Sequence, residues 1–252
     1  MSKSPTTRFS DRVENYVRYR PGYPPAVIDL LRTECGLRPD HIVADIASGT
    51  GLFTQLLLEN GNSVFAVEPN AEMREMGDHE MGYHSRLLSV AGSAEDTTLS
   101  PGSMDFVTAA QAAHWFDLAR ARKEFVRILK PGGWCVLLWN ERRTDTTPFL
   151  REYEQMLLDY GTDYKEVRHE RTTAVIHGFF EPSSCREHIF DMRQMFDYEG
   201  TAGRLLSSSY VPLAGHRNYA PMMKELGRIF RAHAERGMVE FEYNTRVYYG
   251  HL

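Results

Sequence analysis

A short turn carries the glycines best placed to bring a ligand against the main chain. Ile42–Ile46 is an apolar run typical of a buried strand, and Leu52–Asn60 has the apolar spacing of a helix. Gly49 and Gly51 lie between them. Because glycine lacks a Cβ, the backbone can turn sharply there and approach a ligand closely, while the helix behind it offers free N–H groups. The pattern predicts a ligand-binding loop at this strand end.

Acidic side chains accompany the loop at neighbouring strand ends. Asp45 lies near the end of the first strand, and Glu68 follows the expected strand Ser63–Val67. A carboxylate at the position of Glu68 can accept hydrogen bonds from both hydroxyls of a ribose. Ser93–Glu95 follows a third expected strand, where a loop can border an adenine. The set predicts an adenosine ligand with a cationic or amine-bearing group near Asp45.

The glycine spacing separates two classes of nucleotide ligand. The dinucleotide fingerprint GxGxxG needs a third glycine, but Thr54 stands there when the pattern starts at Gly49, and Leu52 when it starts at Ala47. Asp45 would also repel a pyrophosphate, because both are negative. Both observations count against NAD or FAD. An NAD-dependent oxidoreductase remains the first alternative, and a non-catalytic cofactor-binding regulatory subunit the second.

The loop resembles motif I of the class I S-adenosylmethionine-dependent methyltransferases, specifically their type 11 small-molecule group. That motif, D-x-G-x-G-x-G, is matched by residues 45–51, with Ala47 in place of the first glycine. Asp105–Val107 resembles the family's fourth strand, and Leu129–Gly133 the turn before its fifth. Residues 16–24 resemble the lid segment of the trans-aconitate methyltransferase-like branch.

The resemblance implies a fold, a reaction and a cofactor. The implied fold is α/β and Rossmann-like: a seven-stranded sheet, mostly parallel with the last strand antiparallel, helices on both faces and a helical substrate cap. The implied reaction is transfer of a methyl group from S-adenosylmethionine to a small molecule. The residues expected to bind the cofactor are Tyr16, Arg20, Asp45, Ala47, Ser48, Gly49, Gly51, Glu68, Pro69, Met73, Ser93, Ala94, Glu95, Gln111 and Ala112.

Methyl transfer is an in-line displacement that depends chiefly on orientation, with a general base optional. His114, which follows the fourth strand, is the candidate catalytic residue, as a base or a substrate orienter; otherwise it is a histidine satisfied in its loop. Trp115 and Tyr16 are expected to face the cationic sulfur of the cofactor, unless Trp115 packs in the core. Tyr19 and Arg20 are expected to close over the cofactor, unless they form an exposed arm.

The residues expected to contact the substrate are Tyr19, Trp115, Arg142 and Tyr210. Arg142 and Arg143 follow the fifth strand, where they would bind an acidic substrate or remain solvated charges. Ser207–Tyr210 resembles a substrate-side segment of related enzymes. The histidines and cysteines lack metal-ligand spacing, so no metal site is expected.

Alternating strands and helices must position these side chains. Strands are expected at 42–46, 63–67, 86–91, 104–109, 134–139, 186–196 and 239–249. Helices are expected at 52–60, 70–76, 117–129, 148–160 and 219–236. Strands and helices alternating at the spacing of the first part indicate βαβ units and a parallel sheet, and a short turn at Gly237 would return the last strand antiparallel.

The chain is interpreted as one methyltransferase domain of 252 residues. Its parts are an N-terminal lid and helix (1–35), a cofactor-binding core (36–140), a substrate cap insertion with a strand (141–220), and a C-terminal helix and strand (221–252). The net charge of −5 counts against a nucleic-acid partner. We see no membrane span or secretory signal in the sequence, and its three cysteines are far apart, so we expect a cytoplasmic protein. We expect it to be a monomer or a homodimer.

Overall fold

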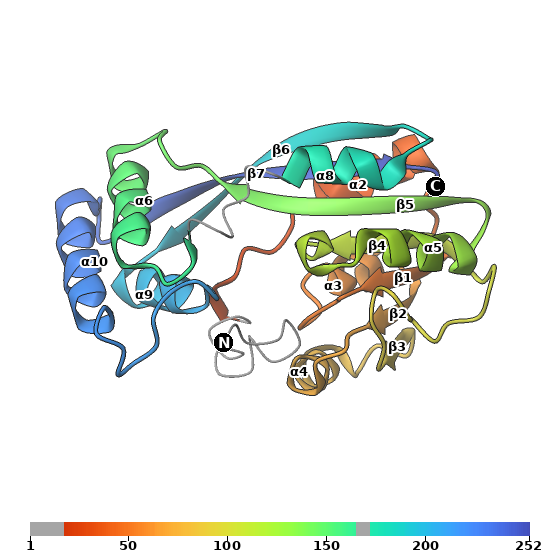
Figure 1. Ribbon diagram of the computed structural model, residues 1–252, viewed down its shortest axis with the longest axis horizontal. Coiled ribbons are helices and arrows are strands. Elements are labelled where there is room, and N and C mark those ends of the chain that lie inside the picture. The colour runs from red at the N-terminus through yellow and green to blue at the C-terminus, as the bar shows by residue number, and fades with distance from the viewer. Residues whose placement is uncertain (1–17, 165–171) are drawn as a thin grey trace.

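The computed structural model describes residues 18–164 and 172–252 (Figure 1). They contain a seven-stranded sheet in the order β3-β2-β1-β4-β5-β7-β6. The strands are β1 (Ile42–Ile46), β2 (Ser63–Val67), β3 (Leu87–Val90), β4 (Met104–Ala110), β5 (Leu129–Arg142), β6 (Cys185–Phe196) and β7 (Val239–Gly250). Six strands run parallel, and β7 lies antiparallel between β5 and β6. The predicted seven-stranded Rossmann-like sheet is therefore confirmed.

Helices cover both faces of the sheet. They are α2 (Ala26–Cys35), α3 (Thr54–Glu59), α4 (Ala71–Met81), α5 (Leu118–Ile128), α6 (Pro148–Tyr160), α8 (Thr172–Phe180), α9 (Tyr198–Leu206) and α10 (Tyr219–His233). Successive strand residues point to opposite faces. In β4, Phe106 packs with α2 and α3, and Val107 packs with α5 and α8. None of the described helices has both the length and the apolar character needed to cross a membrane.

Several element boundaries differ from the sequence prediction; α4, for example, runs to Met81 where the expected helix ends at 76. The expected helix 52–60 is shorter, since α3 spans Thr54–Glu59. The expected turn at Pro131–Gly133 is an excursion inside β5, where the pairing with β4 jumps from Leu129 to Trp134. Proline lacks the N–H that regular pairing needs, so this stretch bulges out of the ladder and the strand resumes beyond it.

The last third of the chain builds a second hydrophobic cluster, which we call the cap cluster. Figure 1 shows α6, α9 and α10 gathered at one end of the long strands β5, β6 and β7. Leu150 and Leu157 of α6 pack there with Leu226 of α10 and with Phe241 of β7, all buried. The far half of β7 belongs instead to the core beneath α2 and α3, through Val247. The long strand β7 thus connects the cap cluster with the main core.

Candidate functional site

The carboxyl ends of four parallel strands bring the predicted cofactor residues to one edge of the sheet. The strands β3, β2, β1 and β4 are neighbours in that order. The segments that follow them are therefore adjacent in space: 91–95 after β3, Glu68 after β2, residues 47–51 after β1, and Gln111 after β4. A main-chain hydrogen bond from Ser48 N–H to the Val67 carbonyl (3.2 Å) ties the end of β1 to the end of β2. This edge is where open α/β sheets bind ligands.

The glycine loop is shaped by three residues with positive φ. Ala47, Gly49 and Gly51 have φ of 53°, 60° and 89°. A Cβ added to Gly51 would lie 1.9 Å from Cε of Met81, so this glycine lets α4 pack against the loop. Within the described residues, and apart from its chain neighbours, no atom would lie within 4 Å of a Cβ added to Gly49. The main chain at Gly49 therefore borders open space, which a ligand can fill.

Glu68 braces this loop from the neighbouring strand. One carboxylate oxygen, Oε2, accepts a hydrogen bond from Gly49 N–H (2.9 Å), and Oε1 accepts one from Asn70 N–H (2.8 Å). Burial raises the pKa of Glu68 above its ordinary value, although these two N–H groups and Arg74 act in the opposite direction. Each oxygen of an ionised carboxylate can accept about two hydrogen bonds, so both retain capacity for a ligand hydroxyl.

Asp45 is enclosed by protein and has two hydroxyl partners. Its side chain is 1% exposed. Oδ2 accepts a hydrogen bond from the Thr54 hydroxyl (2.6 Å), and Oδ1 accepts one from the Thr108 hydroxyl (2.7 Å). Burial raises the pKa of Asp45 to about 6; the two threonines lower it and nearby Glu68 raises it further. The carboxylate thus fixes β1 against α3 and β4 from within, directly beneath the loop.

The other predicted cofactor residues line the same edge at different depths. Glu95 is half-buried, and its Oε1 accepts a hydrogen bond from Asp117 N–H (2.8 Å) at the start of α5. Ser93 Oγ accepts a hydrogen bond from Glu95 N–H (3.3 Å). Ala94, Ala112 and Met73 are buried, and Pro69 is exposed. Tyr16 lies outside the described residues.

A cavity of about 550 Å³ opens beside this edge, toward the cap. Its lining comprises Arg20, Pro21, Tyr23, Leu52, Gln111, His114, Trp115, Asn140, Glu141, Arg142, Arg143, Thr144, Asp145, Thr146, Tyr164, Arg204, Ser209, Tyr210, Asn244 and Arg246. Leu52 and Gln111 come from the glycine loop and the end of β4, so the cavity adjoins the predicted cofactor edge. A volume of this size suits a small organic molecule.

Gln111 and His114 stand on the cofactor side of the cavity. Gln111 has φ of 56°, a left-handed conformation uncommon for a residue with a side chain, and its Oε1 accepts a hydrogen bond from Asn140 N–H (2.8 Å). His114 is exposed in a 3₁₀ turn, Ala113–Trp115, with its ring 4.5 Å from that of Trp115 and 5.2 Å from that of Trp139. Trp115 lines the cavity rather than the core.

Arg142 corrects one expectation from the sequence. Its side chain is 8% exposed and forms an ion pair with Glu154 of α6, so the interpretation as a solvated charge is wrong. It also donates a hydrogen bond to the Tyr164 hydroxyl (3.1 Å). The neighbouring Arg143 is partly buried and forms ion pairs with Asp191 and Glu242. Arg142 is buried, and Arg143 partly buried, because the cap packs over the end of β5.

The other residues predicted to contact the substrate lie in different surroundings. Tyr210 lines the cavity. Tyr19 is buried against α9, where its ring fills the space beside Gly203, and it is not among the described lining residues. Arg20 lines the cavity and donates a hydrogen bond to the Ser207 carbonyl (2.9 Å).

Sequence reasoning missed Asn140 and Arg204, both in the lining. Asn140 lies just beyond the part of β5 that pairs with β4, and Gln111 directly follows β4. This similar position at the same sheet edge is a signal that could have revealed Asn140. It donates a hydrogen bond to the Gly22 carbonyl (2.8 Å) and accepts one from the Thr245 hydroxyl (2.6 Å). Arg204 lies on α9, with no motif nearby. The described residues contain no group of three or more His, Cys, Asp or Glu side chains able to hold a metal.

Residues 44–137 match the family model of a methyltransferase domain. An uncharacterised methyltransferase of Mycobacterium tuberculosis is 38% identical over 160 residues, which are 64% of this chain and 61% of that protein. The chain thus spans about three fifths of the length of the curated relatives it matches. The family match and the relatives show that this part of the chain is similar to methyltransferases. The trans-aconitate branch stays a prediction.

Solved structures share the fold. A protein of Anaeromyxobacter dehalogenans assigned as a type II methyltransferase superposes with a TM-score of 0.67 at 23% identity, over 92% of this chain and 97% of that chain. A phosphoethanolamine N-methyltransferase of Haemonchus contortus, solved with S-adenosylhomocysteine, has a TM-score of 0.58 at 13% identity, over 99% of this chain and 59% of that chain. At these identities the likeness concerns the fold alone.

Proposed function

We propose that this protein transfers a methyl group from S-adenosylmethionine to a small molecule. The observation that carries the proposal is the open space over Gly49, beside the Glu68 carboxylate, at an edge that adjoins a cavity of about 550 Å³. One edge thereby provides a place for a nucleoside and, next to it, a place for a second small molecule. The match of residues 44–137 to a methyltransferase domain supports the same reaction.

The residues at the loop fit an adenosyl cofactor. Glu68 would accept hydrogen bonds from ribose hydroxyls on the lone pairs that Gly49 and Asn70 leave. The loop 93–95 would border the adenine, with Glu95 available from the third strand. The main chain of residues 47–51 would face the methionine part. S-adenosylmethionine, when bound, supplies a methyl group already activated by the positive charge on its sulfur.

The cavity would hold the methyl acceptor. In favourable cases, holding two reactants in line at near-contact distance lowers the activation barrier by about 7–11 kcal/mol. Gln111 and His114 lie on the cofactor side of the cavity and would position the acceptor atom. Where that atom carries a proton, the exposed ring of His114 would accept it.

Calorimetry with S-adenosylhomocysteine and with NAD, followed by incubation of the protein with methyl-labelled S-adenosylmethionine and a metabolite extract, tests the proposal. We expect S-adenosylhomocysteine to bind, NAD not to bind, and label to appear in a small molecule. Glu68→Gln is expected to weaken S-adenosylhomocysteine binding about tenfold or more, since charge-assisted hydrogen bonds to the ribose are lost. Glu72→Gln, on the exposed side of α4, serves as the matched control.

Each other outcome identifies a different function. Binding of NAD in place of S-adenosylhomocysteine would favour the oxidoreductase alternative. Binding of S-adenosylhomocysteine with no labelled product would favour a regulatory subunit that binds the cofactor without catalysis. Binding of neither ligand would contradict the proposal altogether.

A further inference from the structure

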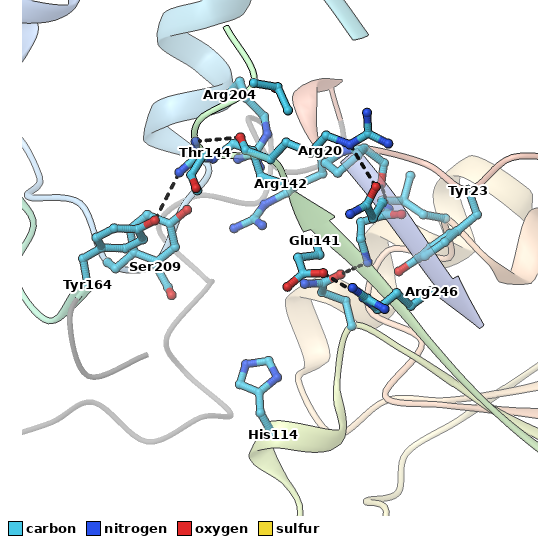
Figure 2. A pocket seen from close by; sticks show the side chains of 18 of the residues that line it. Arg20, Tyr23, His114, Glu141, Arg142, Thr144, Tyr164, Arg204, Ser209 and Arg246 are labelled. Carbon is cyan, nitrogen blue, oxygen red and sulfur yellow. Dashed lines mark hydrogen bonds and ion pairs between the residues drawn. The ribbon is translucent and has the colours of Figure 1, made fainter. Parts of the chain in front are cut away.

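One wall of the cavity is rich in guanidinium groups. Figure 2 shows Arg20, Arg142 and Arg204 gathered on one side of the cavity. Among the described residues, five arginines line the cavity, against two carboxylates, Glu141 and Asp145. The kind of ligand that this wall can bind depends on which of its arginines already have a negatively charged partner in the protein.

Three of the five arginines form ion pairs with carboxylates of the protein. The pairs are Arg142 with Glu154, Arg143 with Asp191 and Glu242, and Arg246 with Glu141 and Glu187. The positive charge of each of these groups is therefore at least partly balanced within the fold.

Arg204 differs from them. It is 5% exposed, yet its hydrogen-bond partners within the described residues are neutral: Nε donates a hydrogen bond to the Tyr243 hydroxyl (3.1 Å) and Nη1 donates one to Ser208 Oγ (3.1 Å). Within the part of the chain that the structure describes, Arg204 is in no ion pair and its Nη2 donates no hydrogen bond. Buried charges in proteins are normally paired, because removing them from water is costly. This guanidinium lines the cavity and is left to pair with something that enters it.

Tyr210 reports the electrostatic character of the same wall. Burial raises the pKa of its phenol, but the positive charges of Arg204, Arg142 and Arg20 together outweigh burial and hold that pKa below its ordinary value. Three guanidinium groups therefore act on one point of the wall, even though Glu154 balances one of them. An anion placed beside Tyr210 would experience the same attraction.

We propose that this wall binds an oxyanion of the methyl acceptor, with Arg204 as its principal partner and the hydroxyls of Ser209 and Tyr210 beside it. The inference rests on the proposed function, because the anchored molecule is the methyl acceptor. A carboxylate and a phosphate both match the planar fork of arginine donors. In Figure 2 His114 stands apart from this wall, across the cavity, so the anchored anion would direct the rest of the molecule toward the cofactor edge.

Calorimetric titrations with glutarate, glutaric diamide and inorganic phosphate, at constant ionic strength and with or without S-adenosylhomocysteine, test this proposal. We expect glutarate, phosphate or both to bind and the diamide not to bind; the first two probes distinguish a carboxylate from a phosphoryl group. Arg204→Met is expected to weaken anion binding about 10- to 100-fold, the range for hydrogen bonds to charged groups, and Arg204→Lys less. Arg228→Met, which removes the same charge from the exposed face of α10, should leave anion binding unchanged.

Three results would overturn the oxyanion site: no anion binds, the diamide binds as tightly as glutarate, or Arg204→Met binds the anion as the wild type does. Circular dichroism establishes whether Arg204→Met folds. If it does not, the wild-type contrast between glutarate and its diamide, together with Arg204→Lys, decides. Binding of S-adenosylhomocysteine without any anion binding would reject this inference and leave the proposed function standing, whereas failure of S-adenosylhomocysteine to bind counts against the proposed function itself.

Discussion

At the scale of single residues, two buried carboxylates beside the glycine loop have different surroundings. Glu68 accepts hydrogen bonds from the main-chain N–H groups of Gly49 in the loop and of Asn70 after β2, and each of its oxygens can accept one more. Asp45 accepts its hydrogen bonds from two threonine hydroxyls and is closed off from solvent. Glu68 is therefore suited to contact a ligand directly, while Asp45 supports the loop from beneath and adds negative potential there.

Asp45 should make stability depend on pH. Its pKa of about 6 in the fold exceeds the ordinary 3.8, so the fold favours the protonated acid. The associated stability is present below about pH 4 and is lost as the pH rises through about 6. Relative to Asp45→Asn, which does not titrate, the wild type should lose up to about 3 kcal/mol of unfolding free energy between about pH 4 and pH 8. Urea unfolding across this range measures the difference; a difference independent of pH would contradict the assignment.

His114 should affect turnover and not cofactor binding. If it accepts a proton from the methyl acceptor, His114→Ala should lower kcat by about 10²- to 10⁴-fold and remove the acidic limb of the pH profile. S-adenosylhomocysteine affinity should stay near the wild-type value, because the ring faces the cavity. An orienting role would instead raise KM with a smaller loss of kcat. Turnover near wild type at all pH values would exclude both roles.

At the scale of elements, the end of β5 is held to the cap by charge as well as by apolar packing. Arg142 reaches from β5 to Glu154 on α6, and both side chains are less than a tenth exposed. The guanidinium carbon also lies 5.0 Å from the ring centre of Tyr153. Thr147 caps α6 by accepting a hydrogen bond from Leu150 N–H (3.1 Å). These contacts set how α6 leaves the sheet, and with it the shape of the cavity.

Breaking this buried ion pair should destabilise the fold strongly. Glu154→Gln leaves the buried charge of Arg142 without a carboxylate, at an expected cost of about 3–5 kcal/mol. Glu225→Gln removes one carboxylate from Arg228 at the surface, with about 1 kcal/mol or less expected. Chemical denaturation measures both variants. Equal, small losses would mean that the Arg142–Glu154 pair contributes no more than a surface pair.

At the scale of the whole molecule, two packing clusters share one strand. The cap cluster is built on the first half of β7, and the main core takes in the second half. The predicted division into one domain with a cap at 141–220 stays a prediction, but the shared strand gives the cap no separate sheet of its own. A loss of packing in one cluster should therefore also destabilise the other. The effects of the two clusters on ligand binding should differ.

Cavity-forming variants in the two clusters should separate stability from cofactor binding. Leu226→Ala in α10 and Leu57→Ala in α3 each remove a fully buried side chain, at about 2–5 kcal/mol. Only α3 follows the glycine loop, so Leu57→Ala should weaken S-adenosylhomocysteine binding and Leu226→Ala should leave it within about twofold. Thermal unfolding and calorimetry check the pair. Equal losses of affinity would show that the cap supports the cofactor edge as strongly as α3 does.

The sequence alone determined the sheet and the edge at which the glycine loop lies, for a local reason. Alternating apolar runs and helical spacing mark βαβ units, and such units place successive strand ends side by side whatever the rest of the chain does. Glu68 and the glycine loop were therefore predictable as neighbours. The helix ends were less predictable. The excursion within β5 was also less predictable, because it depends on how β5 pairs with β4.

Tertiary structure alone decided the chemistry of the cavity beside the glycine loop. Arg204 is distant along the chain from Arg142 and Glu154, and none of the three belongs to a motif. Nothing in their local pattern therefore tells a paired charge from an unpaired one. Their burial and pairing result from apolar side chains of α6, α9 and α10 packing on β7, a set of contacts between remote segments. That packing buries Arg204 beside partners that are neutral within the described residues, and it brings a charge that the sequence would place in solvent to the wall of the cavity.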